Sequence, residues 1–148
     1  MRAMPRFLLV VSLLACLPAA AAAQMVVHTV SLATDGSGDQ TVYTRTTFGR
    51  VVAVRYVPDA TDPMDSGLDI TITDNGTGLQ VLAVTDIGTS ARDFWPRAFS
   101  VTTTGTVATY DGTNTVLDLV PIAGALKIVV DEGGASNEGE LFIYVEGR

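Results

Sequence analysis

Residues 68–84, which read LDITITDNGTGLQVLAV, indicate the fold class of this chain. Two short runs of branched and aliphatic residues, 68–73 and 79–84, flank the triplet Asp74-Asn75-Gly76. Branched side chains favour β-strands, and an Asn-Gly pair favours a tight reversal between two strands. The stretch therefore predicts two strands joined by a tight turn.

The same alternation of apolar runs and turn residues continues on both sides of this stretch. We predict further strands, the fourth and fifth of them on weaker patterns, at residues 26–33, 41–46, 50–57, 99–103, 107–110, 125–130 and 141–146. The last two are expected to pair as a hairpin around residues 131–138. No segment after Met25 keeps a helical apolar period, so crossover helices are not expected and antiparallel pairing is favoured. The fold class is all-β, an antiparallel sandwich or barrel of jelly-roll type.

The final predicted strand is apolar on both of its faces. Successive side chains of a strand point to opposite sides, so Leu141, Ile143 and Val145 share one face while Phe142 and Tyr144 share the other. Residues 50–57 are also expected to be apolar on both faces, with Val52, Val54 and Tyr56 on one face. A strand with one solvated face should be apolar on one side only. The second face is therefore covered either by the chain itself or by a neighbouring subunit.

The first 24 residues resemble a secretory signal peptide. Two arginines precede an apolar run at residues 7–17, and Pro18 leads into alanines 19–23, with cleavage expected after Ala23. Two alternatives stay open: lipid attachment at Cys16, and translation that starts at Met25. In each case a single β domain is expected over residues 25–148.

The charge of the domain argues against two classes of partner. Removing Arg2 and Arg6 with the leader leaves seven basic residues against 16 acidic ones, a net charge of −9. Nucleic acids and anionic membranes bind basic surfaces, so neither is an expected partner. Cys16 is the only cysteine of the sequence, so the domain is expected to have no disulfide and no thiolate metal site.

Catalytic chemistry is not expected. His28 is the only histidine, and it shares a strand face with Val26, Val30 and Leu32. The sequence has no G-x-S-x-G nucleophile turn for such a histidine to serve. We interpret His28 as a packed or interfacial residue and predict that the protein is not an enzyme.

Two groups of acidic residues raise the question of a metal. Asp59, Asp62, Asp65 and Asp69 fall in one loop and the strand after it, while a second group surrounds Gly133-Gly134. Calcium loops usually alternate their ligands and close with a glutamate, and the three-residue spacing here does not match. We interpret both groups as turn-forming and solubilising, with a calcium site in the Asp59 loop as the alternative. No metal and no cofactor are predicted.

The stretch Phe94-Trp95-Pro96-Arg97 is interpreted as a structural anchor. Its aromatic side chains should enter the core or an interface, and Pro96 fixes the backbone angle that follows Trp95. Together with the outer face of the last strand, it supplies the candidate interface residues Phe142, Tyr144, Trp95 and Arg97.

Short motifs along the domain resemble small β-rich structural proteins of tailed bacteriophages and prophages. The similarity extends from Val26 to Gly147 and is carried by TDGSGD (34–39), VYT (42–44), VRYVP (54–58), LDITIT (68–73), WPR (95–97), PIA (121–123), KIVV (127–130) and Gly133-Gly134. The resemblance implies a virion structural component, a head decoration or cement protein, and it transfers no catalytic residue. The leader departs from this pattern, because phage structural proteins assemble in the cytoplasm.

We therefore expect a capsid decoration protein that stabilises a bacteriophage head by binding its surface. Its partners would be the capsid or another virion protein and further copies of itself, with trimers suited to the threefold positions of a capsid. The alternative is an exported β-sandwich binding module of a bacterial envelope, periplasmic or secreted, if the leader is a true signal peptide.

Overall fold

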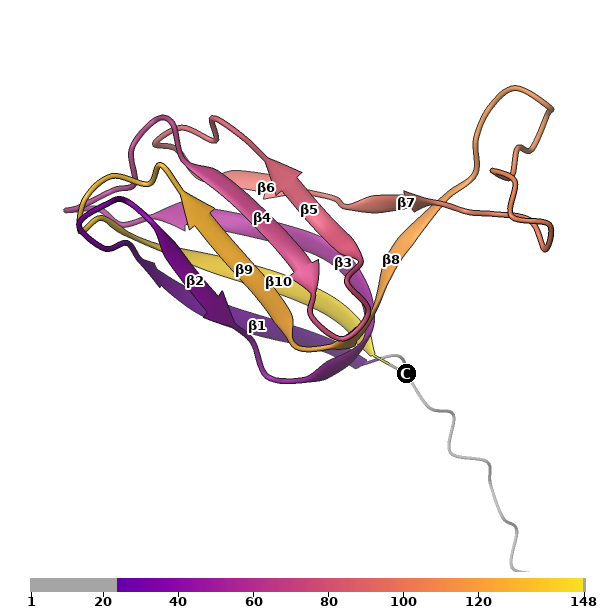
Figure 1. The fold of residues 1–148 in the computed structure, drawn as a ribbon, viewed down its shortest axis with the longest axis horizontal. Coiled ribbons are helices and arrows are strands. Elements are labelled where there is room, and N and C mark those ends of the chain that lie inside the picture. Colours follow the sequence, from indigo (N-terminus) through magenta and orange to yellow (C-terminus); the bar gives the residue numbers. More distant parts are fainter. Residues whose placement is uncertain (1–23, 148) are drawn as a thin grey trace, which may run out of the picture.

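The computed structural model describes residues 24–147, whose strands form two antiparallel sheets packed against each other (Figure 1). The predicted leader therefore lies outside the described residues, except for Gln24, which begins the first strand. The strands are β1 (Gln24–Ala33), β2 (Gln40–Tyr43), β3 (Thr47–Pro58), β4 (Asp69–Asp74), β5 (Gln80–Val84), β6 (Arg92–Phe94), β7 (Arg97–Phe99), β8 (Leu117–Gly124), β9 (Leu126–Asp131) and β10 (Glu138–Gly147). In this part of the chain no helix has the length and apolarity that crossing a bilayer takes.

The strand order is that of a jelly roll. One sheet has the order β1-β10-β3-β8-β7, with β6 also paired to β3, and the other has the order β2-β9-β4-β5. Apart from β6 and β7, the first strand pairs with the last, the second with the next to last, and so on inward, which is the double-sheet jelly-roll arrangement. The expected all-β sandwich of jelly-roll type is confirmed.

The core lies between the two sheets and follows a period of two. In β10 the buried residues are Leu141, Ile143 and Val145, and in β9 they are Leu126, Ile128 and Val130. Alternate residues of a strand point to one face, so both sheets contribute every second side chain to the core.

Residues 68–84 form the predicted hairpin, but residues 125–146 do not. β4 pairs antiparallel with β5 across the turn. In contrast, β9 lies between β2 and β4 in one sheet, whereas β10 lies between β1 and β3 in the other. Residues 132–137 thus cross from sheet to sheet. The alternation in each strand specifies which face is buried, but it does not specify which strand lies alongside.

The weakest predicted strands, at residues 99–103 and 107–110, are wrong. Apart from Phe99, which ends β7, they contain only isolated bridges, such as Val101 with Val107, and the strands of this region are β6, β7 and β8. β8 is absent from the predicted strands; Pro121 lies within it, and proline is normally confined to edge strands and bulges. Pro121 nevertheless pairs with Arg50 at the part of β8 that adjoins β3.

A buried carboxylate connects the two sheets at one end of the sandwich. Asp74, at the end of β4, accepts hydrogen bonds from the Gly76 amide (3.0 Å), the Thr77 hydroxyl (2.8 Å) and the Ala123 amide of β8 (2.9 Å). Burial by itself would raise the pKa of Asp74, but these hydrogen bonds outweigh it and hold the pKa below its usual value. Asp74 therefore stays ionised and links the β4–β5 turn to the other sheet.

Candidate interaction surface

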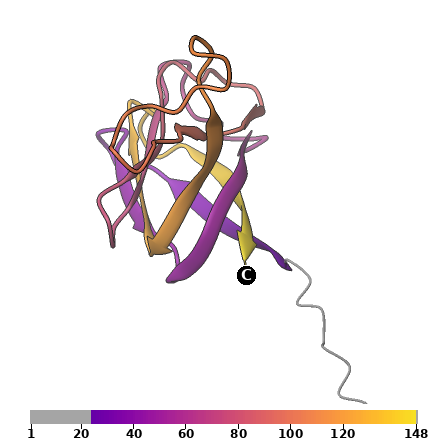
Figure 2. The same ribbon diagram turned by 90° about the vertical axis from the view of Figure 1, so that its right-hand side faces the viewer.

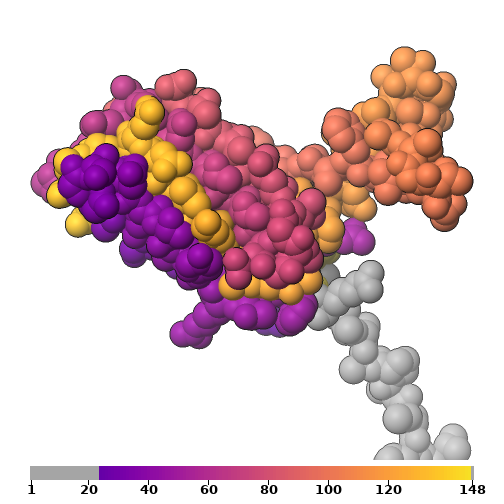
Figure 3. Space-filling view, viewed as in Figure 1, coloured from indigo at the N-terminus to yellow at the C-terminus, as the bar shows by residue number. Residues whose placement is uncertain are grey.

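The most distinctive surface feature is a long excursion, residues 97–118, which we call the arm. It begins with the pairing of β7 and β8, from Arg97 opposite Leu119 to Phe99 opposite Leu117, and then leaves the sandwich. Figure 1 shows the arm projecting from one end of the body, and in the space-filling view it forms a separate lobe (Figure 3). In the view from that end the arm lies in front of the sandwich (Figure 2).

The arm is ordered by its own backbone hydrogen bonds. Three segments meet at its centre, where Ala108 donates to Ser100 (2.8 Å), Val116 donates to Ala108 (2.9 Å) and Ser100 donates to Val116 (2.9 Å). The carboxylate of Asp111 accepts hydrogen bonds from the amides of Thr113 and Asn114 and stabilises the outer turn. These bonds give the arm a shape without burying it.

The arm exposes an unusual amount of apolar surface. Tyr110 is 73% exposed and Phe99 63%, and the exposed large apolar residues of the arm are Phe99, Val101, Val107, Tyr110, Val116 and Leu117. Asp111 is the only charged residue between Ala98 and Leu117. Soluble proteins seldom expose contiguous apolar surface without a partner, so the arm is the leading candidate for a contact site.

The base of the arm contains the predicted anchor, but its tryptophan does not enter the core. Phe94 is half-buried and packs against the core, and Pro96 is buried, whereas Trp95 is 64% exposed. The alternation along β6 turns Phe94 inward and so leaves Trp95 outward. Burial of Trp95 in the core is therefore wrong, and an interfacial role stays a prediction.

Arg97 connects the arm to a β-bulge in β3. Val51 pairs with Val145 and Ala53 with Tyr144, so Val52 is an extra residue without a partner in β10. The guanidinium of Arg97 donates to the Val52 carbonyl at 3.3 Å. This bulge also corrects the predicted faces of β3, since Val51, Val54 and Tyr56 are the buried residues and Val52 is only half-buried.

Phe142 and Tyr144 lie on the outer face of the six-stranded sheet, opposite in direction to the buried residues of β10. Both side chains are half-buried. Phe142 is paired with Thr29 on one side and Arg55 on the other, and Tyr144 with Val27 and Ala53. The alternation predicted for the last strand is confirmed, and contact of its second face with a partner stays a prediction.

Two of the predicted interface residues, Tyr144 and Arg97, are connected through β3. Tyr144 pairs with Ala53, and the neighbouring Val52 holds Arg97 at the base of the arm. The arm itself is absent from the sequence predictions. Its signal was the run of residues 98–117 with a single charge, six large apolar residues and no clean alternation.

The acidic residues of the Asp59 loop are engaged in separate local hydrogen bonds. Asp59 accepts from the amides of Thr61 (2.7 Å) and Asp62 (3.1 Å), and these bonds lower its pKa. Asp69 accepts from the Asp86 amide, and Asp65 from the Asn137 side chain. Within residues 24–147 no group of three His, Cys, Asp or Glu side chains is placed to hold a metal ion.

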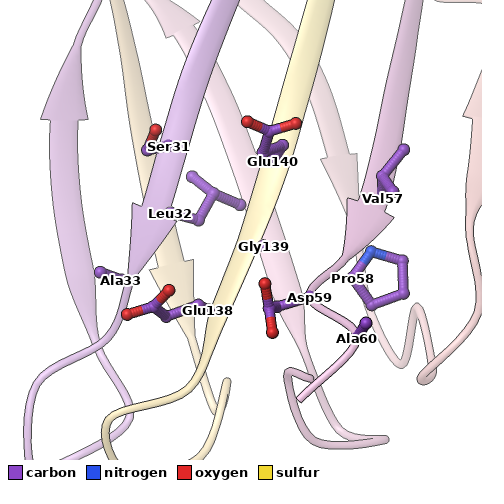
Figure 4. A pocket seen from close by; sticks show the side chains of 10 residues that line it. All are labelled: Ser31, Leu32, Ala33, Val57, Pro58, Asp59, Ala60, Glu138, Gly139 and Glu140. Atoms are coloured by element: carbon purple, nitrogen blue, oxygen red, sulfur yellow. The ribbon is translucent and has the colours of Figure 1, made fainter. Parts of the chain in front are cut away.

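A shallow pocket of about 360 Å³ lies where β1, β3 and β10 approach the loops. Figure 4 shows the carboxylates of Asp59, Glu138 and Glu140 around its rim. The other lining residues are small or apolar, and none is a nucleophile activated by a neighbouring base. His28 lies elsewhere, with its Nε2 atom 2.7 Å from the Thr47 hydroxyl, and burial lowers its pKa.

Comparisons with known proteins supply little beyond this geometry. No protein-family model matches the chain, and no curated protein matches it. Among solved structures, the crystal structure of FLHE is similar over 84% of this chain and 99% of the FLHE chain, with 11% sequence identity and a TM-score of 0.40. The arm and the surfaces next to it are the features that bear on function.

Proposed function

We propose that this chain is a non-enzymatic assembly protein, a jelly-roll body that binds a larger protein surface through its arm. The arm carries the proposal, because it holds its shape while exposing six large apolar side chains, with Asp111 the only charged residue between Ala98 and Leu117. On an acidic protein, such a surface suits an apolar protein site far better than nucleic acid or an anionic membrane. His28, bonded to the Thr47 hydroxyl, has a packing role in this proposal.

In its most specific form, the proposal is a virion structural protein that decorates a bacteriophage capsid. The resemblance from Val26 to Gly147 supports it, and viral capsid proteins are among those that use jelly rolls, although a fold alone does not assign a function. The arm would enter a groove between capsid subunits, with Trp95 and Arg97 at its base. Phe142 and Tyr144 would then face a neighbouring subunit.

A second setting, the exported binding module of a bacterial envelope, is favoured by the signal-peptide pattern of residues 1–23. The intact mass of the natural protein separates the two settings. A chain that starts at Met1 or Met25 supports the virion setting. A chain that starts at Gln24 supports export.

The role of the arm is tested by replacing Phe99, Val101 and Tyr110 with serine. These side chains are exposed, so the free energy of unfolding should change by less than about 1 kcal/mol, while co-sedimentation with empty heads of the encoding phage or prophage should be lost. The matched control replaces Thr102, Thr104 and Thr106 with serine, which keeps the hydroxyl groups of the tip. If the apolar variant still binds like the control, the arm is not the contact site.

A further inference from the structure

One edge of the six-stranded sheet is open along a full-length strand. β1 pairs with β10 over ten residues, from Gln24 opposite Gly147 to Ala33 opposite Glu138, and is the terminal strand of its sheet within residues 24–147. Figure 1 shows β1 at the border of the sandwich, with β2 belonging to the other sheet. The outward N–H and C=O groups of β1 are therefore available to a further strand.

The hydrogen bonds at the end of β1 show which residues face outward. The Thr34 amide donates toward β10, to the Asn137 carbonyl at 3.0 Å. The Ala33 amide points the other way and is capped by the side-chain oxygen of Gln40, also at 3.0 Å. Bonding directions alternate along an antiparallel strand, so Thr29 and the other odd-numbered residues present their backbone groups to the open edge.

β1 also lacks the features that normally protect an edge. Proteins shield edge strands with lysine, proline, bulges or short length. The sequence of β1, QMVVHTVSLA, contains no Lys, Arg, Asp, Glu or Pro, and its register with β10 runs without a bulge. By contrast, the terminal strands β2 and β5 of the other sheet have four and five residues.

Exposed apolar side chains and an open groove border this edge. Met25 is 51% exposed and Val27 46%, and Tyr43 on β2 is 53% exposed. Between β1 and β2 runs a groove of about 550 Å³, lined by residues 26–31 and 42–45. A strand added to β1 would cover these side chains as well as satisfy the backbone groups.

The absence of acidic residues makes this edge suited to a second copy of this chain. The domain has a net charge of −9, so two copies repel each other over most of their surfaces. β1 carries no acidic residue, and Arg45 is the only Lys, Arg, Asp or Glu in the lining of the groove. Two identical edges can meet here without opposing carboxylates, and an antiparallel pair of identical strands has the two-fold symmetry of the commonest dimers.

We propose that β1 pairs antiparallel with β1 of a second copy and joins the two six-stranded sheets into one. The contact is two-fold and produces dimers. It does not involve the arm, which stays free to bind another protein. This proposal is independent of the proposed function, because it can hold whether or not the arm binds a capsid.

The decisive variant is Thr29→Pro. Proline removes the outward amide of Thr29 and blocks an approaching strand, while the amides that bond to β10 belong to the even-numbered residues. Thr29→Ala is the matched control, because it removes the same side chain and keeps the amide. Sedimentation equilibrium of the purified full chain should show a dimer for the wild type and for Thr29→Ala. Thr29→Pro should raise the dissociation constant of the dimer at least about tenfold.

Thr29→Lys serves as a second variant if the proline disturbs folding, since it places like charges on both edges of the pair. Amide hydrogen exchange at low and high protein concentration then locates the contact. Protection that rises with concentration in β1 alone supports the proposal. A wild-type monomer at all concentrations, an unchanged dimer in folded Thr29→Pro or Thr29→Lys, or protection that rises in the arm instead of β1 would overturn it.

Discussion

Replacing Asp74 with alanine should destabilise the protein by about 3 kcal/mol. The carboxylate accepts three hydrogen bonds, from the Gly76 amide, the Thr77 hydroxyl and the Ala123 amide, each worth about 1 kcal/mol once the cost of burying the charge is subtracted. The Ala123 bond reaches β8 in the other sheet, so its loss loosens the contact between the sheets as well as the turn. Urea denaturation at pH 7 measures the change, with the exposed Asn75→Ala as control, expected within about 0.5 kcal/mol of wild type.

The same variant has a pH signature. The folded-state pKa of Asp74 is lowered, so its contribution to stability is complete above the unfolded value of 3.8 and is lost as the pH falls through the folded value. The gap in stability between wild type and Asp74→Ala should therefore narrow below pH 3.8. A destabilisation below about 1 kcal/mol at pH 7, or a gap of equal size at pH 7 and below the folded-state pKa, would refute the role assigned to this carboxylate.

Two further predictions concern the proposed interface. Trp95→Ala should lower the free energy of unfolding by less than about 1 kcal/mol, because the side chain is 64% exposed. Phe94→Ala should lower it by about 2 kcal/mol, because Phe94 packs against the core. Thermal unfolding compares the two variants, and a larger loss in Trp95→Ala would contradict the placement of this segment. Replacing both Phe142 and Tyr144 with serine should leave the chain folded, because both side chains lie on the outer face of the sheet, but should weaken binding to a capsid surface. Circular dichroism measures the folding and co-sedimentation measures the binding. Unfolding of the variant would show that this face is part of the core.

Local sequence was sufficient for the fold class and for one hairpin. Residues 68–84 combine two apolar runs with an Asn-Gly turn, and both signals act between residues close in sequence. The buried alternation of Leu141, Ile143 and Val145 could also be predicted, because it follows from the geometry of a single strand. The excess of acidic residues led to the expectation that nucleic acids and anionic membranes are not partners.

Tertiary structure decided which strands lie side by side and which apolar residues stay exposed. β9 and β10 are consecutive yet lie in different sheets, because packing across the whole sandwich selects among pairings that alternation leaves equal. The bulge at Val52 and the outward turn of Trp95 depend on the change of partners along β3, which no local pattern records. The arm is the largest such case: beyond Phe99 and Leu117, which pair with each other, its apolar residues resemble strand residues but join no sheet. The sequence by itself determined what a regular strand such as β10 would bury, whereas contacts between distant segments determined where the chain remains open to a partner.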